Sequence, residues 1–265
     1  MVRLEREIPG VPLPLVERVV EQLLGLEPEA TAVLLTGSYA KGTAAVASDL
    51  DLVAITPSPR TSYRMWFEEH HPDASLHISV GAKTAAAWQA GASSPARWSL
   101  GFPAVNDAVY LWTHPERSAS LGDDPSLRHP AATPELEDFL DFVLKAKRSA
   151  NGADELGLRW FAQAAASLAP ALLIPLNEQR IVRDRRDALD AALALGVAPD
   201  TYAADVPICL GLASSSSVEV KAATARLSLD LLSFLREHAP DIDQQPQIGK
   251  YLADGTLERR LRLID

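Results

Sequence analysis

The apolar positions near the N-terminus change from a helical to an extended pattern. Between residues 14 and 24 they recur three or four residues apart, with Pro14 suited to the first turn and Gly25 following the last of them. The next apolar run covers residues 31–36 and stops at Gly37. This order predicts a helix followed by a short buried strand.

Three more strand patterns follow in the first half of the chain. Residues 50–55 are mostly apolar, residues 76–80 alternate apolar and polar side chains, and residues 108–112 form a last apolar run. Alternation is typical of a strand with one buried face. A helix is predicted over residues 83–89. We therefore expect an α/β (α+β) domain with a mixed sheet at about residues 1–125.

From Thr133 onward the pattern is helical, with breaks at proline, glycine and serine. The polar, proline-bounded segment 122–130 precedes it and is the predicted linker. Four helices are expected: from Thr133-Pro134 to Asn151-Gly152, over 156–169 with Pro170 and Pro175 stopping or bending it, over 180–195, and from the capping box Ser216–Glu219 to about residue 238. Together they predict an α-helical bundle domain over residues 130–265.

Composition excludes several classes of protein. With 47% hydrophobic and 23% charged residues, the 265-residue chain is too apolar for intrinsic disorder and long enough for two cores. No run of about 18 apolar residues predicts a membrane span, and no apolar signal core follows the N-terminus, so a cytoplasmic protein is expected. The single Cys209 excludes an internal disulfide and a cysteine-rich zinc site.

The net charge of −10, from 25 basic and 35 acidic residues, argues against a long nucleic acid as partner. Proteins that bind polynucleotides usually need a basic face to release counterions from the phosphates. An acidic surface suits a cationic small molecule or another protein, although only through weak long-range steering.

The candidate chemistry lies in Gly37-Ser38 and, ten residues later, in Asp49 and Asp51 at the start of a predicted strand. Strand geometry points both carboxylates to the same face. Two like charges held this close are unfavourable unless a cation lies between them. Oxygen ligands on a rigid strand suit Mg²⁺, which takes its remaining ligands from water and substrate phosphates. The pair therefore predicts a metal site.

The Gly-Ser pair adds a phosphate site to the prediction. Gly37 lets the backbone approach a phosphate closely, and Ser38 offers a hydroxyl and an N–H group to its oxygens. The alternative interpretation is a tight turn followed by a strand whose acidic residues are merely solvated.

The combination resembles the signature of the DNA polymerase β-like nucleotidyltransferase superfamily. The motif match covers about Val33 to Ile55, and the order of elements extends the likeness loosely to Trp112. Within the superfamily, the run Gly-Ser-Tyr-Ala-Lys-Gly is similar to a small bacterial and archaeal branch. That branch contains antibiotic nucleotidyltransferases of the kanamycin and lincosamide type and the minimal nucleotidyltransferases. A nucleotidyltransferase domain followed by a helical bundle also resembles the antibiotic enzymes.

The resemblance implies a mechanism and a role for each motif residue. The protein would transfer a nucleotidyl group from a nucleoside triphosphate, most simply ATP, to an acceptor hydroxyl with Mg²⁺ and release pyrophosphate. Asp49 and Asp51 would be catalytic and hold the metal, and Ser38 with the Gly37 backbone would bind the β- and γ-phosphates. Lys41 would touch phosphate from the turn; the alternative is a solvated loop lysine.

One position departs from the family pattern. Family members usually supply a third carboxylate from a later strand, and the matching position here is His77. Three interpretations compete. His77 itself acts as base or ligand, since imidazole titrates near neutral pH; Asp73, which shares its parity, reaches inward; or the third carboxylate is absent and the protein only binds nucleotide. The nearby Glu68–His71 run fits neither a helix face nor a strand face, which predicts a solvated acidic loop.

Three functions remain open on these grounds. The first is transfer to a small-molecule hydroxyl, aminoglycoside-like in the most specific form, because an acidic chain suits a polycationic acceptor. The second is nucleotidylation of a protein partner, against which stands the predicted helical bundle of this chain. The third is a nucleotide-binding or regulatory protein with an incomplete catalytic triad.

Overall fold

The computed structural model describes residues 3–45, 48–71, 74–117, 121–242 and 246–262. It divides into two compact units. The first, called the sheet unit below, comprises Met1–Ser94 and Val105–Pro130. The second, called the helical unit, comprises Pro95–Ala104 and Ala131–Asp265. The fold is therefore a mixed-sheet α/β unit and a helical unit, as the sequence pattern predicts.

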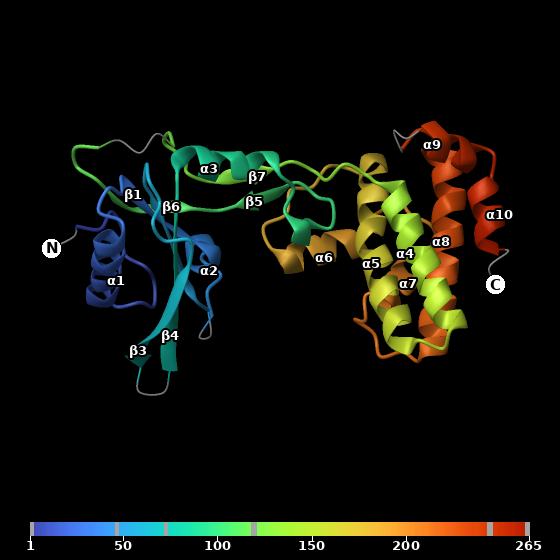
Figure 1. Cartoon of the computed structure of the whole chain (residues 1–265), viewed down its shortest axis with the longest axis horizontal. Coiled ribbons are helices and arrows are strands. Elements are labelled where there is room, and N and C mark those ends of the chain that lie inside the picture. The colour runs from blue at the N-terminus through green and yellow to red at the C-terminus, as the bar shows by residue number, and fades with distance from the viewer. Residues whose placement is uncertain (1–2, 46–47, 72–73, 118–120, 243–245, 263–265) are drawn as a thin grey trace. The chain divides into compact units, whose positions relative to one another are not determined.

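A five-stranded mixed sheet forms the centre of the sheet unit (Figure 1). Its strand order is β3-β4-β2-β1-β6, in which β2 and β4 run parallel and the other neighbours run antiparallel. The strand bounds are Ala32–Thr36 for β1, Leu50–Ile55 for β2, Arg64–His71 for β3, Ala74–Lys83 for β4 and Val109–Thr113 for β6. The central strand β1 is buried along its whole length, which explains its uninterrupted apolar run.

The two faces of the sheet carry different side chains. Helix α1 (Leu13–Leu26) packs its apolar stripe against one face, where Leu50 and Leu52 of β2 lie. Helix α3 (Ala85–Ala90) places Trp88 against the other face, next to Ile55. Because side chains alternate along a strand, Asp51 lies on the α3 face.

Three local predictions for the sheet unit are corrected. The predicted helix 83–89 begins only at Ala85, because β4 continues to Lys83 and Thr84 caps the helix by accepting a 3.0 Å hydrogen bond from Ala87 N. The predicted loop Glu68–His71 is the end of β3, where pairing with β4 overrides the absence of an alternating pattern. The predicted linker contains a short strand, β7 (Leu127–His129), which pairs with β5 (Ala104–Asn106).

The helical unit is a bundle in which α4, α5 and α8 pack around one apolar core (Figure 1). Its α-helices are α4 (Leu136–Asn151), α5 (Glu155–Leu173), α6 (Arg185–Leu193), α7 (Tyr202–Cys209), α8 (Ser217–His238), α9 (Pro246–Ala253) and α10 (Thr256–Arg262). The capping box at Ser216 and Glu219 is present, as predicted. Helices α7, α9 and α10 had no clear sequence signal.

The helix predicted over residues 180–195 is shorter at both ends. Helix α6 spans Arg185–Leu193, and Asp184 caps its start by accepting a hydrogen bond from Asp187 N.

The start of α4 and the end of α5 also differ from the prediction. Helix α4 begins at Leu136 with Glu135 as its N-cap, two residues after the predicted Thr133-Pro134 start. Helix α5 continues through Pro170 to Leu173. Proline removes one backbone hydrogen bond from a helix, but Pro170 and the residues that follow it are buried in the unit. Their packing offsets that loss.

One short segment from the first half of the sequence belongs to the helical unit. Phe102 and Ala104 are buried against Val182 and the apolar side of α6. The backbone follows the same contact, since Val182 N donates a 3.0 Å hydrogen bond to Pro103 O. The boundary predicted near residue 125 therefore misses an excursion of the chain over residues 95–104.

One segment of the described chain, Glu155–Leu176, is long and apolar enough to cross a membrane by length and composition. More than half of its most apolar stretch is buried inside the structure. Helix α5, which makes up most of this segment, contributes to the apolar core of the helical unit.

Candidate active site

The predicted motif residues Gly37 and Asp51 touch each other at the end of β1. Thr36 pairs with Asp51 across the antiparallel strands, so the chain turns into helix α2 (Gly37–Lys41) directly beside the Asp51 side chain. Gly37 has a φ of 68°, and a Cβ atom added there would lie 2.2 Å from Asp51 Oδ2. Only glycine allows both this backbone conformation and this approach.

Asp49 and Asp51 form a coupled pair of half-buried carboxyls. The pKa of the Asp51 carboxyl is raised to about 6, chiefly by burial and then by the negative charge of Asp49. His77 and a hydrogen bond from the Ser79 hydroxyl group act in the opposite direction and lower the pKa of Asp51. Asp51 is therefore not simply solvated, because it feels the negative charge of Asp49 in a partly desolvated place.

Strand β4 brings two further side chains to the same face. Ser79 lies directly across from Asp51 in the parallel pairing, and His77 precedes it by two residues. The His77 Nε2 atom is buried and, within the described part of the chain, has no hydrogen-bond partner. Neither position is a carboxylate, so the third acid of the family pattern is not supplied here by the described stretch of β4. Asp73, the other candidate, lies outside the described residues.

The remaining motif residues lie on the short helix α2. Ser38 follows Gly37, and its Oγ atom is also buried without a hydrogen-bond partner among the described residues. Lys41 ends the helix, is partly exposed and lies one turn beyond Ser38. A buried hydroxyl without a partner is unfavourable unless a ligand or water satisfies it, which favours a binding role for Ser38.

Sequence reasoning missed the contribution of β3 and of Ser79. Met65 pairs with Ser79, and Phe67 pairs with His77, whose ring it stacks against at a centroid distance of 5.1 Å. Tyr63 reaches the same group, because Ser79 Oγ donates a 2.9 Å hydrogen bond to Tyr63 Oη. Two features of the sequence could have predicted this face. Tyr63, Met65 and Phe67 are spaced two residues apart, and so are His77 and Ser79 on the neighbouring strand.

The donors present fit a divalent cation such as Mg²⁺. Burial, and after it the charge of Asp49, raises the pKa of the Asp51 carboxyl. A cation between the two carboxylates would offset both effects. Among the described residues no group of three or more His, Cys, Asp or Glu side chains is placed to hold a metal ion. Such a cation would therefore take further ligands from water and phosphate oxygens, which is the usual behaviour of Mg²⁺.

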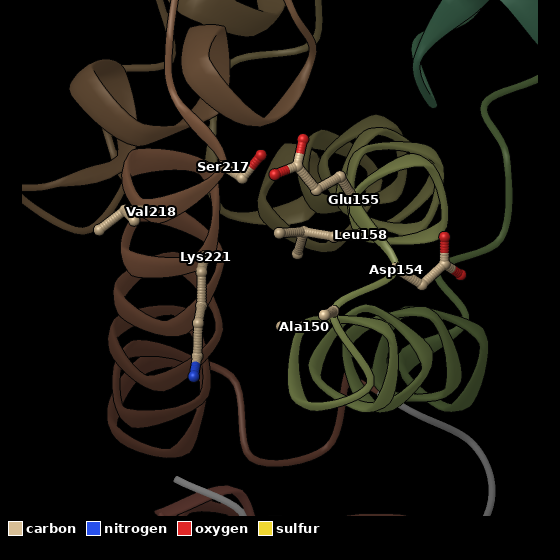
Figure 2. A pocket seen from close by; sticks show the side chains of 8 residues that line it. Ala150, Asp154, Glu155, Leu158, Ser217, Val218 and Lys221 are labelled. Atoms are coloured by element: carbon tan, nitrogen blue, oxygen red, sulfur yellow. The ribbon is translucent and has the colours of Figure 1, made fainter.

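The helical unit contains a pocket of its own, of about 180 Å³, between the start of α5 and the start of α8 (Figure 2). Figure 2 shows the carboxylate of Glu155 directed toward Ser217 across this pocket, while Val218 points away from it. Leu158 and Ala150 line its apolar side. The lining combines an apolar wall with two acidic residues, Asp154 and Glu155, and with Lys221. No sequence motif predicted this pocket.

Two family matches agree with this geometry. Residues 16–84 match the family described as Nucleotidyltransferase domain, and this range contains every motif residue of the site. The sheet unit with its Gly-Ser turn and aspartate pair therefore defines a nucleotidyltransferase. Residues 135–237 match the family described as Nucleotidyltransferase, substrate binding domain. The chain is accordingly a DNA polymerase β-like nucleotidyltransferase of the antibiotic-nucleotidyltransferase branch.

Other comparisons add little. A solved structure titled nucleotidyltransferase-like protein, from Exiguobacterium sibiricum 255-15, is similar at 12% sequence identity and a TM-score of 0.40. The likeness covers 87% of this chain and 78% of that one, and at this TM-score it carries no weight in the assignment. No curated protein matches the chain.

Proposed function

We propose that the protein transfers a nucleotidyl group from a nucleoside triphosphate, with ATP as the first candidate, to a hydroxyl group of a small molecule and releases pyrophosphate. The observation that supports this most directly is the contact between Gly37 and the Asp51 carboxylate. In this proposal the Gly37-Ser38 turn binds phosphate and the aspartate pair binds the metal, and the contact brings the two groups side by side. Triphosphate chemistry needs both groups at one place.

The turn binds the leaving part of the nucleotide in this proposal. The Ser38 hydroxyl, which has no partner among the described residues, donates to an oxygen of the β- or γ-phosphate. Gly37 leaves room for the phosphate because it has no side chain. Lys41 lies one turn away and adds positive charge on the same side.

The aspartate pair holds Mg²⁺. When bound, the cation neutralises charge on the α-phosphate and on the departing oxygen of an in-line displacement. Asp49 and Asp51 fix its position, because Asp51 is on a paired strand and Asp49 immediately precedes that strand. Positioning and electrostatics then supply most of the rate acceleration.

His77 acts as the general base in this scheme. Its Nε2 atom takes the proton of the acceptor hydroxyl as the acceptor oxygen attacks the α-phosphorus. The bond from the α-phosphorus to the oxygen that bridges to the β-phosphate breaks, and pyrophosphate leaves with that electron pair. The ring is held by stacking on Phe67, and its Nε2 is not engaged elsewhere among the described residues.

The class of acceptor rests on weaker support. The match of residues 135–237 to a substrate binding domain favours a small molecule over a protein partner. The net charge of −10 favours a cationic acceptor such as an aminoglycoside. A reaction that consumes nucleoside triphosphate and uses Mg²⁺ as its cofactor also fits the cytoplasm.

The test is incubation of the protein with labelled nucleoside triphosphates, Mg²⁺ and a panel of aminoglycosides. Label transfer by the wild type that Asp49→Ala abolishes supports the proposal. A second candidate function, nucleotide binding without transfer, is favoured by the lack of an acid at His77 and Ser79. Tight, Mg²⁺-dependent triphosphate binding with no labelled product from any acceptor supports that second function.

A further inference from the structure

Three exposed apolar side chains lie in a row at the start of β3, with Tyr63 just before the strand and Met65 and Phe67 within it. Tyr63, Met65 and Phe67 have 58%, 51% and 66% of their surface exposed. Large apolar residues exposed singly are common, but a contiguous group of them marks a binding surface more often than chance. We call these three residues the β3 platform.

The β3 platform is on the same face of the sheet as the aspartate pair. Met65 pairs with Ser79, and Ser79 pairs in turn with Asp51, so the three side chains form one row across three strands. Phe67 stacks on His77 at 5.1 Å with an interplanar angle of 26°, and Tyr63 is hydrogen-bonded to Ser79 at 2.9 Å. The platform therefore adjoins the reacting groups directly.

The neighbouring residues of β3 point to the opposite face, where they have partners. Trp66 packs against the core under α1 and donates a 3.1 Å hydrogen bond from its indole to Glu68 Oε1. Glu68 also pairs with Arg18 of α1 at 2.9 Å. Within residues 63–68, the site face is thus uncharged, and the charged carboxylate Glu68 is turned away from it.

The geometry of an in-line displacement indicates whether the nucleotide or the acceptor lies next to the β3 platform. The attacking and leaving oxygens lie on opposite sides of the α-phosphorus. The leaving pyrophosphate is on the Gly37-Ser38 side, next to β1. The attacking hydroxyl must then approach from the β4 and β3 side, since the strand order is β1-β2-β4-β3.

We propose that the β3 platform binds the acceptor and selects one whose reacting hydroxyl is next to an uncharged, planar or aliphatic ring face. This inference rests on the proposed nucleotidyl transfer and narrows its substrate class. Tyr63 and Phe67 offer flat faces that pack on such a ring, and Met65 adapts to its shape. Tyr63, Met65 and Phe67 carry no charge, so these three side chains themselves offer no ion pair to amino groups of the acceptor.

A matched pair of probes tests the β3 platform without requiring turnover. Phenyl β-D-glucopyranoside and methyl β-D-glucopyranoside carry the same sugar hydroxyls and differ in one uncharged ring. Their dissociation constants are measured by saturation-transfer NMR on the full chain with Mg²⁺ and a non-hydrolysable ATP analogue. We expect the phenyl probe to bind the wild type about tenfold more tightly than the methyl probe.

Substitutions assign that difference to the platform. Phe67→Ala combined with Met65→Ala should remove the tenfold preference, Phe67→Tyr should keep it, and Leu13→Ala on α1 should leave it unchanged. Equal binding of both probes to the wild type overturns the inference. So does a preference that survives the double substitution, or a double substitution that weakens binding of the ATP analogue instead, because the platform would then bind the nucleotide base.

Failure of the proposed function gives a different result. If the ATP analogue does not bind the wild type with Mg²⁺, the proposed transfer is wrong whatever the glycosides do. If the analogue binds and the probes show no preference, only the acceptor assignment is wrong.

Discussion

Gly37 and Asp51 depend on each other in a way that neither residue shows by itself. The carboxylate occupies the space that any side chain at position 37 would fill. Because Gly37 has no side chain, the turn that we propose binds phosphate lies within reach of the acid pair. The absence of a side chain at Gly37 thus lets the proposed phosphate-binding and metal-binding groups lie side by side.

Gly37→Ala should therefore lower the rate of nucleotidyl transfer strongly while leaving the fold largely intact. The new Cβ would meet Asp51 Oδ2 at 2.2 Å in a backbone conformation with a φ of 68°, so the carboxylate must move. A displacement on the order of 1 Å costs about a hundredfold in rate. The measurements are nucleotidyl transfer and Mg²⁺-dependent triphosphate binding, compared between Gly37→Ala and the wild type.

The control for that prediction is Gly10→Ala. Gly10 also has a positive φ, of 80°, but no atom lies within 4 Å of a Cβ added there. Gly10→Ala introduces the same backbone strain without a clash. It should therefore lower the unfolding free energy and leave nucleotidyl transfer unchanged. Equal loss of activity in both variants would show that strain, and not the carboxylate, is responsible.

Cys209 provides a reporter of unfolding in the helical unit. Burial raises the pKa of its thiol to about 11, and only 3% of the residue is exposed. We expect almost no reaction with Ellman's reagent at pH 8 in the native protein and rapid reaction in urea, because the thiolate is the reactive form. Since the unfolded thiol releases its proton first, stability should fall as the pH rises from about 9 toward 11. Fast labelling without denaturant would contradict the buried position.

A capping box stabilises the first turn of helix α8. Glu219 N donates a 3.2 Å hydrogen bond to Ser216 Oγ, and Ser216 N donates a 2.7 Å hydrogen bond to Glu219 Oε2. The box satisfies two backbone N–H groups that a helix start leaves without partners. It also fixes where the central helix of the bundle begins.

Ser216→Ala should cost about 1 kcal/mol of unfolding free energy, measured by urea denaturation, with Ser214→Ala as the control. The hydrogen bonds from Ser216 hold the pKa of the Glu219 carboxyl below its ordinary value. A lowered native pKa contributes stability above the unfolded value of about 4.3, and that contribution is lost as the pH falls through the native pKa. The difference between Ser216→Ala and wild type should accordingly shrink in acid. If the difference in unfolding free energy between the two proteins stays constant below about pH 4, the Glu219 charge does not contribute to the effect of the cap, and this prediction is wrong.

The chain as a whole divides into two units that are not consecutive in sequence. Residues 95–104 leave the sheet unit, contribute Phe102 and Ala104 to the apolar cluster around α6, and return. The side chain of Phe102 is 2% exposed. The helical unit therefore includes a piece of the first half of the sequence in its core.

Phe102→Ala should destabilise the helical unit by about 3–5 kcal/mol, the usual cost of removing a buried aromatic ring. Denaturation followed by circular dichroism at 222 nm reports mainly on this helical part. Phe67→Ala, which removes a ring that is 66% exposed, should change the same transition by less than about 1 kcal/mol. Similar effects of the two substitutions would contradict the assignment of residues 95–104 to the helical unit.

Much of the fold could be predicted because it depends on neighbours in the chain. Helix α1, strands β1, β2, β4 and β6, and the capping box of α8 all follow from local periodicity and end signals. The missed elements lacked such signals. Strand β3 ends in Glu68–His71, which has no apolar alternation, and it forms because β4 supplies the pairing partner.

The sequence by itself determined the class of the protein, because the glycine-serine turn, the spacing of two aspartates and the strand around them are all encoded within one short stretch. Only the tertiary structure decided the immediate surroundings of that motif. It set Ser79 beside Asp51, stacked Phe67 on His77 and pressed Gly37 against a carboxylate. The physical reason is that strand register and side-chain contact depend on packing between distant segments, and no local pattern records that packing.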